Sequence, residues 1–213
     1  MSKMMIGNKI KSDPAQKEVF QKVFQEIAFA KKGQKCIVFS TDNSDLATRF
    51  LPLSLAAAVT ADQGKQRFVV INGNNKHSSA EEDSGNVGLT NYLSGHCTLN
   101  EIIAETDLPQ IDVIPVGRAS MNLALLLEDE SLKNIFALCT ERYDWVLVNT
   151  APLSENDMSA VHFARFCDGA VLLAKDHATG KKWLKTAKAI FHQTGCPVEG
   201  CIVADAKKEK NYR

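Results

Sequence analysis

KCIVFSTDNSDLATRF, residues 35–50, is the stretch that decides the fold of this chain. An apolar strand pattern at 36–39 runs into a polar turn, and the apolar run 51–61 behind it predicts a helix. In α/β folds such a strand–turn–helix unit directs backbone N–H groups and a helix N-terminus at an anion. A phosphate-binding loop also needs glycines, a lysine and a Ser or Thr, whereas residues 40–49 contain no glycine and no lysine. The stretch therefore predicts the architecture of a phosphate site without its usual chemistry.

Strand and helix patterns alternate along the rest of the chain. Strands are predicted at 67–71, 111–116, 145–148, 170–174 and 200–204, and helices at 13–30, 88–93, 98–104, 123–127, 131–141, 155–166 and 181–193. Since Pro52 is tolerated only in the first turn of a helix, the helix after the polar turn is expected to begin near 50–52. The alternation predicts an α/β fold with a predominantly parallel sheet and helices on both faces. We expect one domain over 1–213, with flexible ends at 1–12 and 206–213.

The composition is that of an ordinary globular protein. Of the 213 residues 45% are hydrophobic and 23% are charged, and the net charge is zero. This balance gives no reason to expect nucleic acid or an anionic membrane surface as a partner. No apolar run predicts a transmembrane helix and no signal peptide is recognisable, so a cytoplasmic protein is expected. The scattered cysteines are expected to be buried apolar side chains of a reducing compartment, and not zinc ligands.

Five further segments occur in an order that narrows the choice of α/β fold. They are VGLTNYLSG at 87–95 with LNEII at 99–103, IDVIPVG at 111–117, MNLALLL at 121–127, YDWVLVNTAP at 143–152 and DGAVLL at 168–173. Together they resemble the signatures of the bacterial tyrosine kinases, the BY-kinases. The resemblance implies a P-loop NTPase-like three-layer sandwich of the MinD/ParA type. It also implies that strands 36–39 and 145–148 lie side by side at the centre of the sheet.

Several chemical groups of that family are replaced in this chain. The resemblance places the Walker A loop at 43–50, without glycine or lysine, and the acidic motif at 71–77, where both aspartates are replaced. The Walker B aspartate corresponds to Asn149. Mg²⁺ favours carboxylate and phosphate oxygens, and phosphoryl transfer depends on Lys and Mg²⁺ for charge stabilisation. Of the family's tyrosine-rich tail only Tyr212 is present, and of its ring-forming E-x-x-R-x-x-R motif only Glu18.

The candidates for a vestigial nucleotide site are seven polar residues. They are Ser40, Thr41, Thr48, Arg49, Asn72, Asn149 and Asp205. Arg49 is either a surrogate cation for a phosphate or an ordinary solvated arginine. The hydroxyl groups of Ser40 and Thr41 either bond a phosphate or cap the turn after the strand.

The remaining candidates also allow two interpretations. Asn72 and Asn149 end strands on the side where open α/β sheets bind ligands, and one expectation is that they bond to each other. Asp205 either lies where related ATPases hold the adenine or is a turn residue. No catalytic residue and no metal ligand is predicted.

The resemblance and the replacements lead to three hypotheses. The first is a catalytically inactive BY-kinase-like protein without a cofactor, a regulator or binding partner in exopolysaccharide and capsule biosynthesis and export. Its partner would be a membrane polysaccharide co-polymerase or an active BY-kinase, which would recruit it to the inner face of the membrane. The second is a divergent tyrosine autokinase or ATPase of the same pathway that uses ATP, Mg²⁺ and Arg49. The third is a module that binds another anion or nucleotide without metal.

Overall fold

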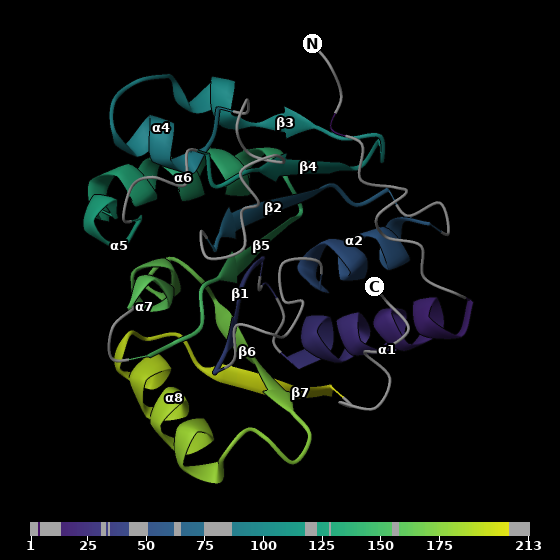
Figure 1. Ribbon diagram of the computed structural model, residues 1–213. Coiled ribbons are helices and arrows are strands. Elements are labelled where there is room, and N and C mark those ends of the chain that lie inside the picture. Colours follow the sequence, from purple (N-terminus) through teal and green to yellow (C-terminus); the bar gives the residue numbers. More distant parts are fainter. Residues whose placement is uncertain are drawn as a thin grey trace.

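One seven-stranded sheet forms the centre of the protein, in the order β3-β4-β2-β5-β1-β6-β7 (Figure 1). The computed structural model describes residues 4, 14–30, 33, 35–42, 51–61, 65–74, 87–117, 123–127, 129–154 and 158–204. The strands are β1 Cys36–Thr41, β2 Phe68–Gly73, β3 Ala104–Glu105, β4 Ile111–Ile114, β5 Trp145–Thr150, β6 Gly169–Lys175 and β7 Val198–Ala204. All neighbours are parallel except β3 and β4. The predicted, predominantly parallel sheet is confirmed.

The helices lie in the predicted alternation with the strands. They are α1 Pro14–Ala30, α2 Leu51–Thr60, α4 Leu89–Leu93, α5 Leu123–Leu126, α6 Asp129–Arg142, α7 Ser159–Ala164 and α8 Lys181–Gln193, with a 3₁₀ turn, η2, at Leu99–Ile102. α2 begins at Leu51 and so keeps Pro52 in its first turn, as predicted. None of the helices in the described ranges combines the length and the apolar character needed to cross a bilayer.

The central strands β1 and β5 lie side by side, which confirms that prediction. Cys36 of β1 pairs with Val146, and Phe39 pairs with Asn149. Both strands are buried along their whole length. Fully buried, continuous apolar strands are typical of the middle of a parallel sheet that is covered on both faces.

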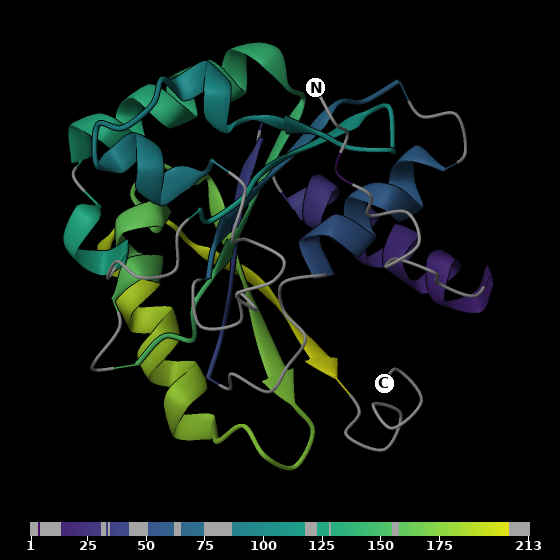
Figure 2. The ribbon, with the colours of Figure 1, turned by 45° about the horizontal axis from the view of Figure 1, so that its top comes forward.

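Two helical layers cover the sheet, α1 and α2 on one face and α4 to α8 on the other (Figure 2). Successive side chains of a strand point to opposite faces. In β1, therefore, Ile37 and Phe39 join the core under α1 and α2, whereas Cys36 and Val38 join the core under the other helices. The two cores give the three-layer sandwich that the resemblance implied.

Two aspartates tie the amino ends of the strands together. Asp168, just before β6, accepts hydrogen bonds from the backbone N–H groups of Lys35 and Cys36 at 2.7 and 2.9 Å. Asp144, just before β5, accepts one from the backbone N–H of Arg67 at 2.8 Å. These contacts fix where β1 and β2 begin, and therefore the level at which their carboxyl ends finish.

One predicted helix is wrong beyond its first turn. The segment does begin with a capping box at Thr98, in which the Glu101 carboxylate accepts hydrogen bonds from the Thr98 N–H at 2.7 Å and from its hydroxyl at 2.6 Å. The turn ends at Ile102, however, and Ala104 pairs with Val113 in the antiparallel strand β3, which was not predicted. Two residues of strand carry too little pattern to be recognised in sequence.

Candidate functional site

The candidate site lies where β1, β2 and β5 end, the edge at which open α/β sheets bind ligands. Asn149 is level with Phe39 in β1 and with Asn72 in β2. The Asn149 side chain donates a hydrogen bond from Nδ2 to Oδ1 of Asn72, at 3.2 Å. The expected bond between the two asparagines is therefore present, although 77 residues separate them.

The asparagine pair is largely self-contained. Asn72 Oδ1 accepts a second hydrogen bond, from the backbone N–H of Asn74 at 3.2 Å. Asn149 is 1% exposed, and its Oδ1 atom has no hydrogen-bond partner among the described residues. The pair thus presents neutral amide groups, with one buried carbonyl oxygen as its remaining acceptor.

Ser40 lies on the other face of the sheet from this pair. Asn149 and Asn72 alternate in phase with Leu147 and Val70, which belong to the core under α1 and α2. Ser40 alternates in phase with Val38, which belongs to the opposite core. Its hydroxyl group is buried and has no partner within the described ranges.

The other candidates divide into one buried residue and three that lie outside the described residues. Thr41, next to Ser40, is 0% exposed, and its backbone carbonyl accepts a hydrogen bond from the N–H of Leu153 at 2.8 Å. Thr48, Arg49 and Asp205 are not among the residues that the structure describes. The structure therefore joins Asn72 to Asn149, with Thr41 at the same edge of the sheet.

Asp42 is a residue of this edge that sequence reasoning missed. Its Oδ1 atom accepts a hydrogen bond from the Thr179 hydroxyl at 2.9 Å, and the Thr179 hydroxyl oxygen in turn accepts one from the backbone N–H of Lys175 at 2.8 Å. The carboxylate thus ties the end of β1 to the turn after β6. A carboxylate directly after a buried strand is the signal that could have drawn attention to it.

Four buried cysteines of the described part of the chain have thiols that ionise only at high pH. Burial raises the pKa of three thiols to about 12, those of Cys36, Cys139 and Cys196. Burial also raises the pKa of the Cys167 thiol, so all four stay protonated at neutral pH. Among the described residues no group of three or more His, Cys, Asp or Glu side chains has an arrangement that could hold a metal ion.

The sheet order and its layers define the class of fold as P-loop NTPase-like. The kinase domain of Escherichia coli tyrosine kinase ETK superposes with a TM-score of 0.79 at 20% identity, over 91% of this chain and 77% of that one. The septum site-determining protein MinD of Pyrococcus horikoshii, in complex with Mg-ADP, gives a TM-score of 0.63 at 16% identity, over 79% and 69%. The fold is thus that of the MinD/ParA-type ATPases and of the BY-kinase domains.

Sequence comparison names the relatives within that class. No family model matches the chain. Tyrosine-protein kinase CpsD of Streptococcus agalactiae is 26% identical over 209 residues, which cover 93% of this chain and 87% of that protein. Tyrosine-protein kinase ptk of Acinetobacter johnsonii is 25% identical over 186 residues, 85% of this chain and 25% of that protein. The relatives of this chain are bacterial tyrosine kinases.

Proposed function

We propose that this chain is a catalytically inactive BY-kinase-like protein that regulates or binds a component of exopolysaccharide or capsule production and export. One observation carries the proposal. Asn72 and Asn149 bond to each other at the edge where the resemblance places the two acidic motifs of the kinases. The proposed protein binds neither ATP nor Mg²⁺ in its working state.

The amide pair argues against phosphoryl transfer on electrostatic grounds. Mg²⁺ is held in such sites by one or two carboxylates together with substrate phosphates. An amide oxygen carries no net charge, and Asn72 Oδ1 already accepts two hydrogen bonds. The turn at 40–49 also lacks the lysine and glycines that would surround the phosphates. The metal and the cation that carry most of the rate in phosphoryl transfer are then both missing.

The partner in this proposal is a membrane polysaccharide co-polymerase or an active BY-kinase. The resemblance supports this choice, because the family works in pairs of that kind. The protein would be cytoplasmic and would reach the inner face of the membrane through the partner. An intact sheet with two well-packed cores can serve as a rigid binding module whether or not it holds a nucleotide.

Nucleotide binding by the full chain tests the proposal. A ligand present at 100 times its Kd raises the unfolding free energy by about 2.7 kcal/mol, which corresponds to about 5–10 °C in Tm for a chain of this size. We expect no change in Tm with ATP and Mg²⁺, or with Mg²⁺ alone. The positive control is an active BY-kinase domain, whose Tm should rise with ATP and Mg²⁺ under the same conditions. A clear Mg²⁺-dependent rise would refute the proposal and favour the divergent ATPase that uses Arg49.

The regulatory half of the proposal needs its own assay. An active BY-kinase is incubated with labelled ATP, with and without this chain, and its autophosphorylation rate is measured. We expect the rate to change with the concentration of this chain and to saturate. An unchanged rate, together with no binding to the cytoplasmic segment of the co-polymerase, would contradict the proposed role.

A second candidate function has one observation in its favour. The Ser40 hydroxyl is buried without a partner among the described residues, and such a group is a donor that a ligand oxygen could satisfy. A module that binds an anion or nucleotide without metal would use it. In the Tm assay this candidate differs from both others, because ADP would stabilise the protein equally with and without Mg²⁺.

A further inference from the structure

A groove of about 460 Å³ lies between α1 and the edge strand β7, on the α1 side of the sheet and away from the asparagine pair. Its lining residues are Val23, Glu26, Ile27, Val171, Glu199, Gly200, Cys201 and Ile202. The floor and walls are mostly apolar, and two carboxylates are present without any basic side chain. In Figures 1 and 2, the purple helix α1 lies beside the yellow strand β7.

The α1 wall of the groove is held rigidly. Gln21 Nε2 donates to the backbone carbonyl of Ala58 in α2 at 2.9 Å. The ring of Phe24 packs edge-on against Phe68 and Trp145, with centroids 5.5 and 4.8 Å away. A wall anchored to the neighbouring helix and to the sheet cannot easily close the gap, so the groove is preformed.

The β7 wall is the exposed edge of the sheet. β6 is the strand that pairs with β7, and no other described strand does. Ala170 pairs with Val198 but Val171 pairs with Gly200, so Glu199 is the extra residue of a bulge. Val203 near the end of the strand is 61% exposed. A long, partly apolar edge is a site where an extended segment can add to the sheet or lie against it.

We propose that this groove is the docking site for the chain's own segment 207–213, KKEKNYR. Residues 207–213 carry four basic side chains and one acidic side chain, so the segment is positive where the groove is negative. Tyr212 supplies an aromatic ring for the apolar floor. The docked segment covers the edge of β7 and keeps Tyr212 away from modifying enzymes.

The length of the segment permits this contact. β7 ends at Ala204, and its residues at the groove lie about four positions earlier, about 13 Å back along the strand at 3.3 Å per residue. Tyr212 is eight residues beyond Ala204, an extended reach of about 26 Å. A turn followed by a return along β7 therefore brings Tyr212 level with the groove. Because the segment is tethered, its effective concentration is on the order of millimolar, and a weak intrinsic affinity suffices for occupancy.

Limited trypsin digestion of the full chain tests the proposal through cleavage at Lys207, Lys208 and Lys210. The groove variant Glu26→Gln/Glu199→Gln removes both carboxylates without adding a cleavage site. We expect it to lose the segment about fivefold faster than the wild type, because cleavage tracks the population of the undocked form. The matched control Glu130→Gln/Glu141→Gln alters two exposed glutamates of α6 and should leave the rate unchanged.

A carbodiimide crosslink provides a measurement on the unaltered chain. Lysines of the segment should form amides with Glu26 or Glu199, and a mixture of ¹⁴N and ¹⁵N chains should give these products within single chains. Equal cleavage rates in the groove variant and the wild type would overturn the proposal. Crosslinks found only between chains would also overturn it, and would assign the groove to a second copy.

Discussion

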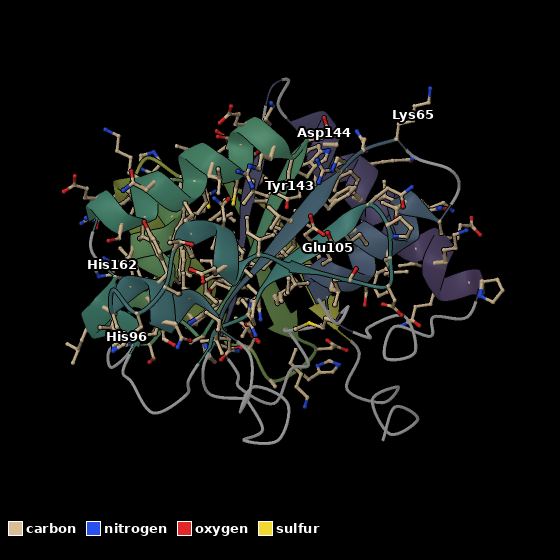
Figure 3. The ribbon with its side chains drawn as sticks, turned by 90° about the horizontal axis from the view of Figure 1, so that it is seen from above. Lys65, His96, Glu105, Tyr143, Asp144 and His162 are labelled. Carbon is tan, nitrogen blue, oxygen red and sulfur yellow. The ribbon has the colours of Figure 1, made fainter. Side chains whose placement is uncertain are left out.

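The contact between Tyr143 and Asp112 gives a prediction whose size follows from the structure. The Tyr143 hydroxyl donates to Asp112 Oδ2 at 2.6 Å, and Arg67 Nη2 lies 3.5 Å from the same oxygen. The Arg67 guanidinium also lies over the Tyr143 ring, 4.9 Å from its centroid. Tyr143 directly precedes Asp144 at the start of β5, where Figure 3 shows both side chains. The cluster thus links the amino ends of β2, β4 and β5.

The substitution Tyr143→Phe removes this hydrogen bond and leaves the ring in place. A hydrogen bond to a charged group contributes about 1.5–3 kcal/mol. Because Asp112 keeps Arg67 and retains some exposure to water, we expect a loss near the lower limit, about 1.5 kcal/mol in unfolding free energy. That loss corresponds to a fall of about 3–6 °C in Tm. Urea denaturation monitored by circular dichroism measures it.

The pH dependence of the same variant separates this contact from a packing effect. Burial, followed by the hydrogen bond to Asp112, raises the pKa of Tyr143. The folded state therefore holds the phenolic proton more tightly than the unfolded state. The resulting stability is complete below the unfolded pKa of about 10 and is lost as pH rises from there toward the folded pKa. The difference between wild type and Tyr143→Phe should accordingly shrink above pH 10.

Tyr92→Phe is the matched control, since it removes the hydroxyl of a half-buried tyrosine in α4. We expect it to change the unfolding free energy by less than about 0.5 kcal/mol. If Tyr143→Phe cost no more than this control, or if its effect did not depend on pH, the hydrogen bond to Asp112 would carry no stability.

Three further predictions concern other parts of the chain. Asn149→Asp should not create micromolar, Mg²⁺-dependent ATP binding in calorimetry, because catalytic groups that act as a unit are not restored singly. It should instead lower the unfolding free energy by about 3–5 kcal/mol at pH 7, since it buries an uncompensated charge, and the loss should shrink in acid as the carboxyl group protonates. A thiol reagent at pH 7 should modify the half-buried Cys97 in the folded protein, whereas modification of the four buried thiols before unfolding would contradict their burial. Glu101→Gln should destabilise the η2 turn, because hydrogen bonds from Thr98 lower the pKa of the Glu101 carboxyl. That stabilisation is present above the unfolded pKa of the Glu101 carboxyl and is lost as pH falls through its folded pKa. The unfolding free energies of wild type and Glu101→Gln should therefore become equal in acid, which urea denaturation at several pH values would measure.

The sequence by itself determined the class of fold and most of its elements. α8 was predicted with its observed bounds, Lys181–Gln193, and α2 with its start at the residue before Pro52. These features depend on local patterns, namely the hydrophobic period and the position of proline. Each pattern lies within a short stretch of consecutive residues, so the sequence alone reveals it. The resemblance, together with the strand order, also sufficed to place β1 beside β5.

Only the tertiary structure decided what lies at the carboxyl edge of the sheet. Ser40 and Asn149 both looked like members of one site, but the phase of each strand places them on opposite faces. The bond between Asn149 and Asn72, and the tether from Asp42 to Thr179, join residues 77 and 137 positions apart. Such contacts depend on the register between strands, which the aspartates at their amino ends and the packing of two cores set together. The groove beside β7 likewise arises from where α1 crosses the sheet, because a helix pattern predicts an apolar face but not the strand against which it packs.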